Sequence, residues 1–304
     1  MNKRIYMDHA ASAPMSRAAI EYMAEISGEF YGNPSSIHSP GVAAKKLLNE
    51  SREKIAALLG CRADEIFFTS GGTESVTWAI RAGAVISPKS RHIISTAIEH
   101  HALQSVLENL AREGFKIDFL PANENGIVRA ADLEKMIHAG VELVSCMFLN
   151  NEIGTIQPVG EIAEIAHRSG ALAFTDAVQA VGHMPVDLSK IGADMLAFSG
   201  HKFGSPKGIG GLFVRRGLKI PALIPGGGQE SSRRGGTENV VGAAVMAFAL
   251  EESLAKLSER KRILAMRERI INTVLEKIFF LQYNLLLLVS MKIKSKTKPN
   301  GRQP

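Results

Sequence analysis

The sequence has little cysteine and few aromatic residues, and it contains no internal repeat. Its two cysteines, Cys61 and Cys146, lie in no CxxC pair, and two thiols alone form neither a disulfide framework nor a metal-ligand cluster. This scarcity is typical of a reducing compartment. In contrast, 45% of the 304 residues are hydrophobic and 22% are charged, which excludes a disordered or collagen-like chain.

No apolar run is long enough to cross a bilayer. The longest, residues 278–289, is interrupted by Gln282 and Asn284 and is shorter than the roughly 20 residues that a spanning helix needs. Residues 1–14 contain no apolar core of the kind found in signal peptides. We therefore predict a cytoplasmic protein without a membrane partner.

Acidic residues are absent from the end of the chain. The formal net charge is +6, and residues 290–304 hold five basic residues, namely Lys292, Lys294, Lys296, Lys298 and Arg302. The remainder of the chain is therefore close to neutral, so the sequence predicts no basic groove for nucleic acid. The tail itself is predicted to be solvated and disordered.

Short apolar runs alternate with helical patterns between residues 65 and 214, which is typical of a mostly parallel sheet covered by helices. Helical patterns are predicted at residues 42–59, 76–80, 130–138 and 159–168, and Gly60 supplies a left-handed stop to the first. Seven strands are predicted, at residues 66–70, 92–98, 115–120, 143–149, 171–175, 194–199 and 208–214. The fold class is therefore α/β with a seven-stranded, mostly parallel sheet.

A long helical pattern follows Val240, with apolar residues spaced near 3.6 as far as about residue 278. We predict that it connects to a second domain. Beyond about Lys277 the helical pattern is lost, and we interpret the remaining residues as a premature or frame-shifted end.

Glycines and polar residues follow five of the predicted strands. Because an open parallel sheet binds ligands outside the carboxyl ends of its strands, we expect these residues to share one pocket. They are residues 71–74, Glu99, His100, Asn150, Asn151, Asp176, Gly200, His201 and Lys202.

Gly72 and Thr73 lie in a glycine turn between a predicted strand and a predicted helix. Such a turn can direct backbone N–H groups and a hydroxyl at an anion on the helix N-terminus, which indicates a phosphate cradle. A plain strand-to-helix turn explains the same residues, since they match neither the P-loop nor the GxGxxG pattern.

Lys202 follows a predicted strand in a glycine-rich, apolar setting beside Ser199 and His201. Burial there would lower the pKa of its amine and make the amine available for a Schiff base, whereas most lysines simply lie at the surface. Asp176 ends an apolar strand, where a carboxylate needs a cationic partner such as a protonated pyridine nitrogen. Its structural alternative is an N-cap for the segment that follows.

His100 can lie flat on an aromatic ring or act as an acid or base. Together with Glu99 and His101 it also suggests a metal site, but no carboxylate or histidine recurs at ligand spacing, so we predict no metal. Asn151 and Gln179 are neutral donors suited to a phenolic oxygen on a cofactor ring. Turn capping and an exposed helix position are their alternatives.

Eight ordered motifs, which extend from about Tyr6 to Asn239, resemble those of fold-type I pyridoxal-phosphate enzymes of aminotransferase class V, specifically cysteine desulfurases of the NifS/IscS type. They are YMDHAASAP (6–14), GNPSSIHSPG (32–41), FTSGGTES (68–75), EHHA (99–102), NNEIGTIQP (150–158), TDAVQAVG (175–182), SGHKFGSPKGIG (199–210) and RRGGTEN (233–239). The resemblance implies a large cofactor-binding domain at residues 15–258. It also implies an N-terminal segment, residues 1–14, that joins the small domain, and an incomplete small C-terminal domain at residues 259–304.

By this resemblance the cofactor is pyridoxal 5′-phosphate. Lys202 would join it covalently and move the substrate proton, Asp176 would pair with the pyridine nitrogen, and His100 would stack on the ring. Asn151 and Gln179 would contact the phenolic oxygen.

The resemblance also assigns the residues around the cofactor phosphate. Thr73, Ser199 and His201 would bind the phosphate of their own subunit, beside the glycine turn at Gly72. Thr237 would reach the phosphate of the neighbouring subunit, which implies a homodimer.

The implied reaction converts L-cysteine to L-alanine and passes the sulfur to an enzyme thiolate as a persulfide, for iron–sulfur cluster or thio-cofactor synthesis. A sulfur-acceptor or scaffold protein would be a further partner. In desulfurases the accepting cysteine lies beyond the region of likeness, so we expect cofactor binding with little persulfide turnover.

The cysteines of this sequence are not natural replacements for that acceptor. Cys61 follows the helix stop and Cys146 lies within a strand, and we interpret both as structural. Two alternatives stay open at this point: another class V reaction, such as transamination or lysis of an amino acid, and a catalytically silent dimerising partner.

Overall fold

The computed structural model describes the backbone of residues 5–86 and 91–296, and side chains within these ranges as far as residue 278. The chain divides into two compact units, Met1–Ala255 and Lys256–Pro304, and each is described by itself. The domain boundaries inferred from the sequence stay a prediction.

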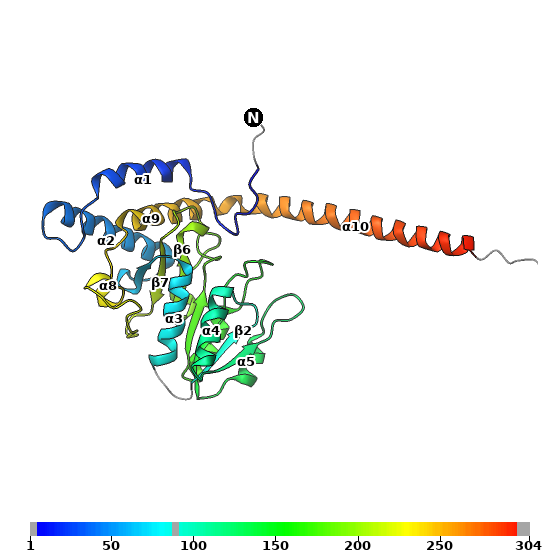
Figure 1. Ribbon diagram of the computed structural model, residues 1–304, viewed down its shortest axis with the longest axis horizontal. Coiled ribbons are helices and arrows are strands. Elements are labelled where there is room, and N and C mark those ends of the chain that lie inside the picture. The colour runs from blue at the N-terminus through cyan, green and yellow to red at the C-terminus, as the bar shows by residue number, and fades with distance from the viewer. Residues whose placement is uncertain (1–4, 87–90, 297–304) are drawn as a thin grey trace, which may run out of the picture. The chain divides into compact units, whose positions relative to one another are not determined.

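The first unit is built on one sheet of seven strands in the order β1-β7-β6-β5-β4-β2-β3 (Figure 1). Strands β6, β5, β4, β2 and β3 run parallel, whereas β7 is antiparallel to its neighbours β1 and β6. The bounds are β1 Ile66–Thr69, β2 His92–Thr96, β3 Lys116–Leu120, β4 Val141–Ser145, β5 Leu172–Asp176, β6 Met195–Ser199 and β7 Gly210–Val214. The predicted α/β class with a mostly parallel, seven-stranded sheet is confirmed.

Helices cover both faces of this sheet. One core cluster joins the strands to α3 and α4, and a second joins them to α2, α5, α6 and α9. The helices of the first unit are α1 Arg17–Glu29, α2 Ser39–Leu59, α3 Gly72–Ile86, α4 His101–Arg112, α5 Ala130–Met136, α6 Val159–Arg168, α7 Leu188–Ile191, α8 Gln229–Ser232 and α9 Val240–Ala255.

Strand β6 shows why apolar residues occupy successive positions in the central strands. Met195 and Ala197 belong to the core cluster on one face, and Leu196 and Phe198 belong to the cluster on the other. Because successive side chains point to opposite faces, a strand buried on both sides needs apolar residues at every position. The sheet thereby holds the carboxyl ends of its parallel strands in fixed relation.

Most predicted bounds agree with the structure within a few residues, and α6 agrees at both ends. Strand β4 is displaced from the predicted residues 143–149, because its pairing with β2 ends at Ser145. The chain nevertheless stays bonded to β5, with the N–H groups of Cys146 and Phe148 donating to Phe174 and Asp176. The predicted helix 76–80 is the middle of the longer α3.

The second unit contains the 3₁₀ turn η3 (Lys256–Glu259) and helix α10 (Arg260–Lys296). The long helix predicted after Val240 is therefore interrupted at residues 256–259. The expectation of lost helical structure after Lys277, and of disorder from residue 290, is wrong as far as Lys296, and residues 297–304 lie outside the described residues. Within the described ranges, no helix is both long and apolar enough to span a membrane.

Candidate active site

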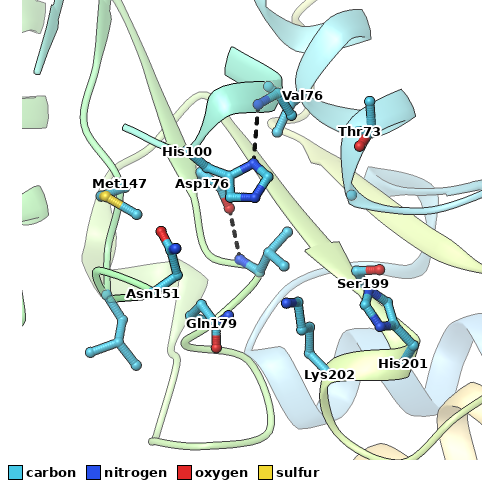
Figure 2. Close-up of a pocket in the computed structure, with 14 residues that line it drawn as sticks. Thr73, Val76, His100, Met147, Asn151, Asp176, Gln179, Ser199, His201 and Lys202 are labelled. Atoms are coloured by element: carbon cyan, nitrogen blue, oxygen red, sulfur yellow. Dashed lines mark hydrogen bonds between the residues drawn. The ribbon is translucent and has the colours of Figure 1, made fainter. Parts of the chain in front are cut away.

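A cavity of about 190 Å³ opens at the carboxyl ends of β5 and β6, where parallel sheets bind ligands. Figure 2 shows side chains from several strand ends gathered around this space. Nine of the ten predicted site residues line it: Gly72, Thr73, His100, Asn151, Asp176, Gln179, Ser199, His201 and Lys202. The tenth, Thr237, is exposed on another loop and is not among the lining residues.

The predicted phosphate cradle lies at the beginning of α3. Its first residues, Gly72 and Thr73, present backbone N–H groups that have no partner within the helix. The Ser199 hydroxyl is buried and has no hydrogen-bond partner in the described part of the chain. Figure 2 shows Thr73, Ser199 and His201 on the same side of the cavity. A helix N-terminus beside an unpaired, buried hydroxyl suits an anionic group.

Asp176 ends β5 with its carboxyl group buried. One oxygen, Oδ1, accepts a hydrogen bond of 2.9 Å from the Val178 N–H, so the predicted capping role and the pocket position coexist. Burial raises the pKa of this carboxyl, although the hydrogen bond from the Val178 N–H and the electrostatic interactions with His100 and Lys202 oppose the shift. No salt bridge reaches Asp176 within the described ranges, and Asp176 lines the cavity, where its carboxyl group is able to accept from a cationic group.

Lys202 lies in the 3₁₀ turn that follows β6, and its side chain is half-buried. Its Nζ donates to the carbonyl oxygens of Ala10, at 2.7 Å, and of Ala11, at 3.1 Å. Burial lowers the pKa of the amine, whereas the negative charges of Asp176 and Asp8 act in the opposite direction. The amine is therefore closer to its neutral, nucleophilic form than that of a surface lysine.

The N-terminal segment forms part of the site, which residue-level sequence reasoning missed. The Ala10 carbonyl also accepts a hydrogen bond of 2.9 Å from Gln179 Nε2, so this oxygen holds two site residues at once. The Ser12 hydroxyl contacts His201 Nδ1 at 3.3 Å. The only sequence signal for this role was the motif at residues 6–14, because alanine carbonyls carry no pattern of their own.

His100 begins α4 as its N-cap, and its Nδ1 accepts a hydrogen bond of 3.1 Å from the Ala102 N–H. This bond requires an unprotonated Nδ1, so the neutral ring carries its proton on Nε2. Asn151 on the same side donates from Nδ2 to Glu152 at 2.7 Å. Figure 2 shows His100 beside Asp176, which is the placement expected of a group that lies against a bound ring.

Glu99 is a buried carboxyl near the site that does not line the cavity, although its place after β2 predicted that it would and its histidine neighbours suggested a metal ligand. Its Oε1 accepts from Thr96 Oγ1 at 2.8 Å, from the Met147 N–H at 2.9 Å and from Ser145 Oγ at 3.3 Å. Burial first, and then the nearby Asp176, raise the pKa of Glu99 to about 8. No group of three potential metal ligands exists among the residues that the structure describes.

Neither cysteine lines the cavity. Cys146 belongs to the hydrophobic core, and burial raises the pKa of its thiol well above the ordinary value. Cys61 is partly buried at the end of α2, where burial and then the charges of Glu65 and Asp64 raise its pKa to about 12. Both thiols therefore stay protonated near neutral pH, as expected of structural cysteines.

Comparison of the sequence with known proteins shows which family the chain belongs to. The aminotransferase class-V profile matches residues 5–284. The chain is 44% identical over 277 residues to cysteine desulfurase IscS of Methanosarcina thermophila, covering 90% of this chain and 69% of the relative. It is 43% identical over 280 residues to cysteine desulfurase IscS of Dictyoglomus turgidum, covering 91% and 71%.

Solved structures show the same relationship. A NifS-like protein superposes with a TM-score of 0.87 at 38% identity, over 90% of this chain and 76% of the other. SspA in complex with cysteine superposes with a TM-score of 0.79 at 33% identity, over 86% and 78%. The chain therefore belongs to the pyridoxal-phosphate-dependent aminotransferase class-V family, within the group whose members are named IscS cysteine desulfurases and NifS-like proteins.

Proposed function

We propose that this protein is a pyridoxal-phosphate-dependent cysteine desulfurase that converts L-cysteine to L-alanine and releases the sulfur to a thiol. The observation that carries the proposal is the pairing, in one cavity, of a buried carboxyl at Asp176 with the amine of Lys202. Such perturbed groups cluster where chemistry is done.

The residues of the cavity fit pyridoxal phosphate. The unpaired Ser199 hydroxyl would bind the phosphate together with Gly72, Thr73 and His201 at the beginning of α3. Asp176 has an oxygen available for the protonated ring nitrogen. The ring of His100 would lie against the cofactor, and the amide groups of Asn151 and Gln179, which also line the cavity, would contact its phenolic oxygen.

When bound, pyridoxal phosphate supplies a carbonyl that joins amines covalently and a ring that takes up electrons from a broken bond. Lys202 holds and moves the proton at the α-carbon of L-cysteine, which requires an amine that is neutral for part of the cycle. Its lowered pKa and the two carbonyl oxygens of Ala10 and Ala11 keep the amine oriented and reactive. The Asp176 carboxylate would hold a positive charge beside it, and such a charge would oppose the rise in pKa that burial causes.

The sulfur of L-cysteine leaves to a thiolate, and neither cysteine of this sequence is suited to receive it. Cys146 is buried in the core and Cys61 lies away from the cavity, and both have raised pKa values. We propose that neither Cys61 nor Cys146 receives it, and that the sulfur passes on to a sulfur-acceptor or scaffold protein that serves iron–sulfur cluster or thio-cofactor synthesis. Both cysteines are free, which supports a reducing, cytoplasmic setting.

We also propose that the protein acts as a homodimer in which Thr237 completes the phosphate site of the partner subunit. Thr237 is exposed and absent from the cavity of its own chain, so its predicted contact with a phosphate requires a second copy. The exposed apolar side chains of Tyr31, Ile37 and Val42 support an extensive interface.

The assignment is tested by reconstituting the full chain with pyridoxal phosphate, reducing it with borohydride and mapping the modified peptide. The label is expected on Lys202, is lost in Lys202→Ala and is retained in Lys207→Ala, a matched control on an exposed lysine of the same segment. An unlabelled wild-type chain would support the silent-partner alternative. A label on a different lysine would also overturn the assignment.

The reaction is tested with L-cysteine and excess dithiothreitol as the external thiol. Alanine and sulfide are expected in equal amounts, with dithiothreitol oxidised to its disulfide, and Lys202→Ala is expected to lose at least about a hundredfold in rate. A keto acid produced in place of alanine would identify a transaminase, and pyruvate with ammonia would identify a lyase.

A further inference from the structure

An ion pair connects the phosphate cradle to the loop that carries Thr237. Arg234 Nε lies 2.9 Å from Glu74 Oε1, and Arg234 Nη2 lies 3.2 Å from Glu74 Oε2. The geometry is bidentate, and the side chains are only 22% and 12% exposed. A shielded, forked pair of this kind is stronger and more directional than an exposed lysine pair. We call residues 224–239 the Thr237 loop.

Glu74 is an unusual neighbour for a phosphate site. It lies in the first turn of α3, directly after Thr73, where its carboxylate would repel a bound phosphate. Burial alone would raise the pKa of Glu74, but hydrogen bonds from Arg234 and from the Ser70 N–H lower it overall, so the group is ionised. Arg234 therefore neutralises the negative charge of Glu74 beside the cradle, although Arg234 itself belongs to the Thr237 loop.

The Thr237 loop is fixed to the first unit at a second point. Arg52 forms an ion pair with Glu230 at 2.6 Å, and the Glu230 carboxylate also accepts from the Phe68 N–H at 2.9 Å. The two limbs of the loop are in close backbone contact, because a Cβ added at Gly235 would lie 2.8 Å from the Cα of Gly226. Such contacts leave the loop little freedom to reorient.

Thr237 is confined between two anchors. Arg234, three residues earlier, is held by Glu74, and Asn239, two residues later, accepts a hydrogen bond of 2.8 Å from the Gly242 N–H at the beginning of α9. Gly236 takes the left-handed φ of 103° that turns the chain between them. The result is an exposed threonine on a short, tethered projection.

We propose that Glu74 and Arg234 are positioning residues that couple the two phosphate sites of a homodimer. Their ion pair joins the cradle of one subunit to the Thr237 loop of the same chain, and that loop completes the phosphate site of the partner subunit. The inference rests on the proposed function, and in particular on Thr237 acting in the partner subunit. It adds that loss of Arg234 weakens cofactor binding mainly in the partner subunit, because the misplaced loop belongs to that site.

The first test compares Arg234→Ala with Arg17→Ala, which removes an arginine from an ion pair whose side chains are 92% and 63% exposed. We expect the affinity for pyridoxal phosphate, measured by cofactor absorbance and by borohydride labelling of Lys202, to fall about tenfold or more in Arg234→Ala. Arg17→Ala is expected to bind as the wild type does. Equal binding by Arg234→Ala and wild type would overturn the proposal.

The second test separates the two subunits by mixing. Arg234→Ala is combined with Lys202→Ala, which carries an intact Thr237 loop but offers no lysine to label. We expect the Lys202 peptide of the Arg234→Ala subunit to regain most of the lost labelling at limiting cofactor in the mixed dimer, the remaining deficit coming from Glu74 of that subunit, which has lost its ion pair with Arg234. If labelling stays weak, the loss of Arg234 weakens cofactor binding within its own subunit, and the proposed coupling between the two phosphate sites is wrong.

If Arg234→Ala fails to fold, Arg234→Lys replaces it, because lysine keeps the positive charge beside Glu74 and loses only the forked geometry. The same rescue is expected from the Lys202→Ala partner. Failure of the proposed function itself is distinguishable, since the wild-type chain would then show no cofactor label at Lys202 in any mixture.

Discussion

Glu99 follows β2 and Asp176 ends β5, on either side of β4, and burial raises the pKa of both carboxyl groups. Two such groups are not both ionised at low cost, because each charge disfavours the other. Glu99 Oε1 accepts three hydrogen bonds while Oε2 has no partner in the described part of the chain. A neutral Glu99 would keep its three hydrogen bonds and leave the negative charge to Asp176, where the ring nitrogen of the cofactor needs it.

The pKa of Glu99 predicts a pH dependence of stability. Its folded-state value of about 8 lies above the ordinary value of 4.5, so the folded chain retains a proton that the unfolded chain loses. The stabilisation from the neutral group is complete below the unfolded pKa and is lost as pH rises through the folded pKa. In Glu99→Gln, we expect the free energy of unfolding to fall less steeply between these pH values than in wild type.

Urea denaturation of the cofactor-free chain across this pH range measures that slope. Glu99→Ala serves as the comparison, since it leaves three donors without an acceptor and should be less stable than Glu99→Gln by about 1–3 kcal/mol at every pH. Identical slopes for wild type and Glu99→Gln would show that Glu99 ionises normally in the folded chain.

At the scale of elements, the sequence predicted those helix and strand bounds that depend on nearby residues alone. Helix α6 follows Pro158 and is closed by Gly170, so its bounds were predicted at both ends. The central strands were found because they are largely apolar. The strand-end rule then predicted seven of the nine lining site residues, all but Gln179 and Ser199, whereas Glu99, Asn150 and Gly200 follow strands without lining the cavity. Strand β4 was displaced because pairing with β2, rather than hydrophobicity, determines where it ends.

Long-range contacts escaped this reasoning. Lys202 bonds to Ala10 across 192 residues, and Arg234 bonds to Glu74 across 160. Ala10, Glu74 and Arg234 lie within motifs that carry the family resemblance, but nothing in those motifs shows which residues contact one another across the chain. The N-terminal segment and the positioning pair therefore became visible only when the fold was known.

Strands β6 and β7 offer a test of the packing that supports Lys202. A Cβ added at Gly211 would lie 2.1 Å from the ring of Phe198, which is fully buried and has no space to rotate. Gly211→Ala is therefore expected to lower the free energy of unfolding by about 1–3 kcal/mol. Gly28→Ala is the control, because nothing lies within 4 Å of a Cβ at that position in α1.

Thermal or urea unfolding of both variants makes the comparison. Gly28→Ala should leave stability unchanged or raise it by less than about 1 kcal/mol, since alanine favours a helix more than glycine does. If Gly211→Ala unfolds like Gly28→Ala, the contact between β7 and the Phe198 ring is looser than described here.

At the scale of the whole molecule, helix α10 raises the question of what covers its apolar side chains. Ile263, Met266, Ile270, Val274 and Ile278 recur every three or four residues and are each 44–56% exposed. This spacing forms one stripe along a helix, and such a stripe in a water-soluble protein is normally covered by another surface. An uncovered stripe favours association between copies.

We therefore predict that the purified chain forms concentration-dependent species larger than a dimer and binds an apolar dye. Replacing Ile263, Ile270 and Val274 with glutamate should reduce both effects, because the charges cannot be buried in a shared apolar contact. The same number of glutamates at Lys261, Arg267 and Lys277 is the control, since these positions are already charged and exposed. Light scattering and dye fluorescence measure the outcome, while labelling of Lys202 should be the same in both variants because the substitutions leave the cavity untouched. A monodisperse dimer at every concentration would show that the stripe does not drive association.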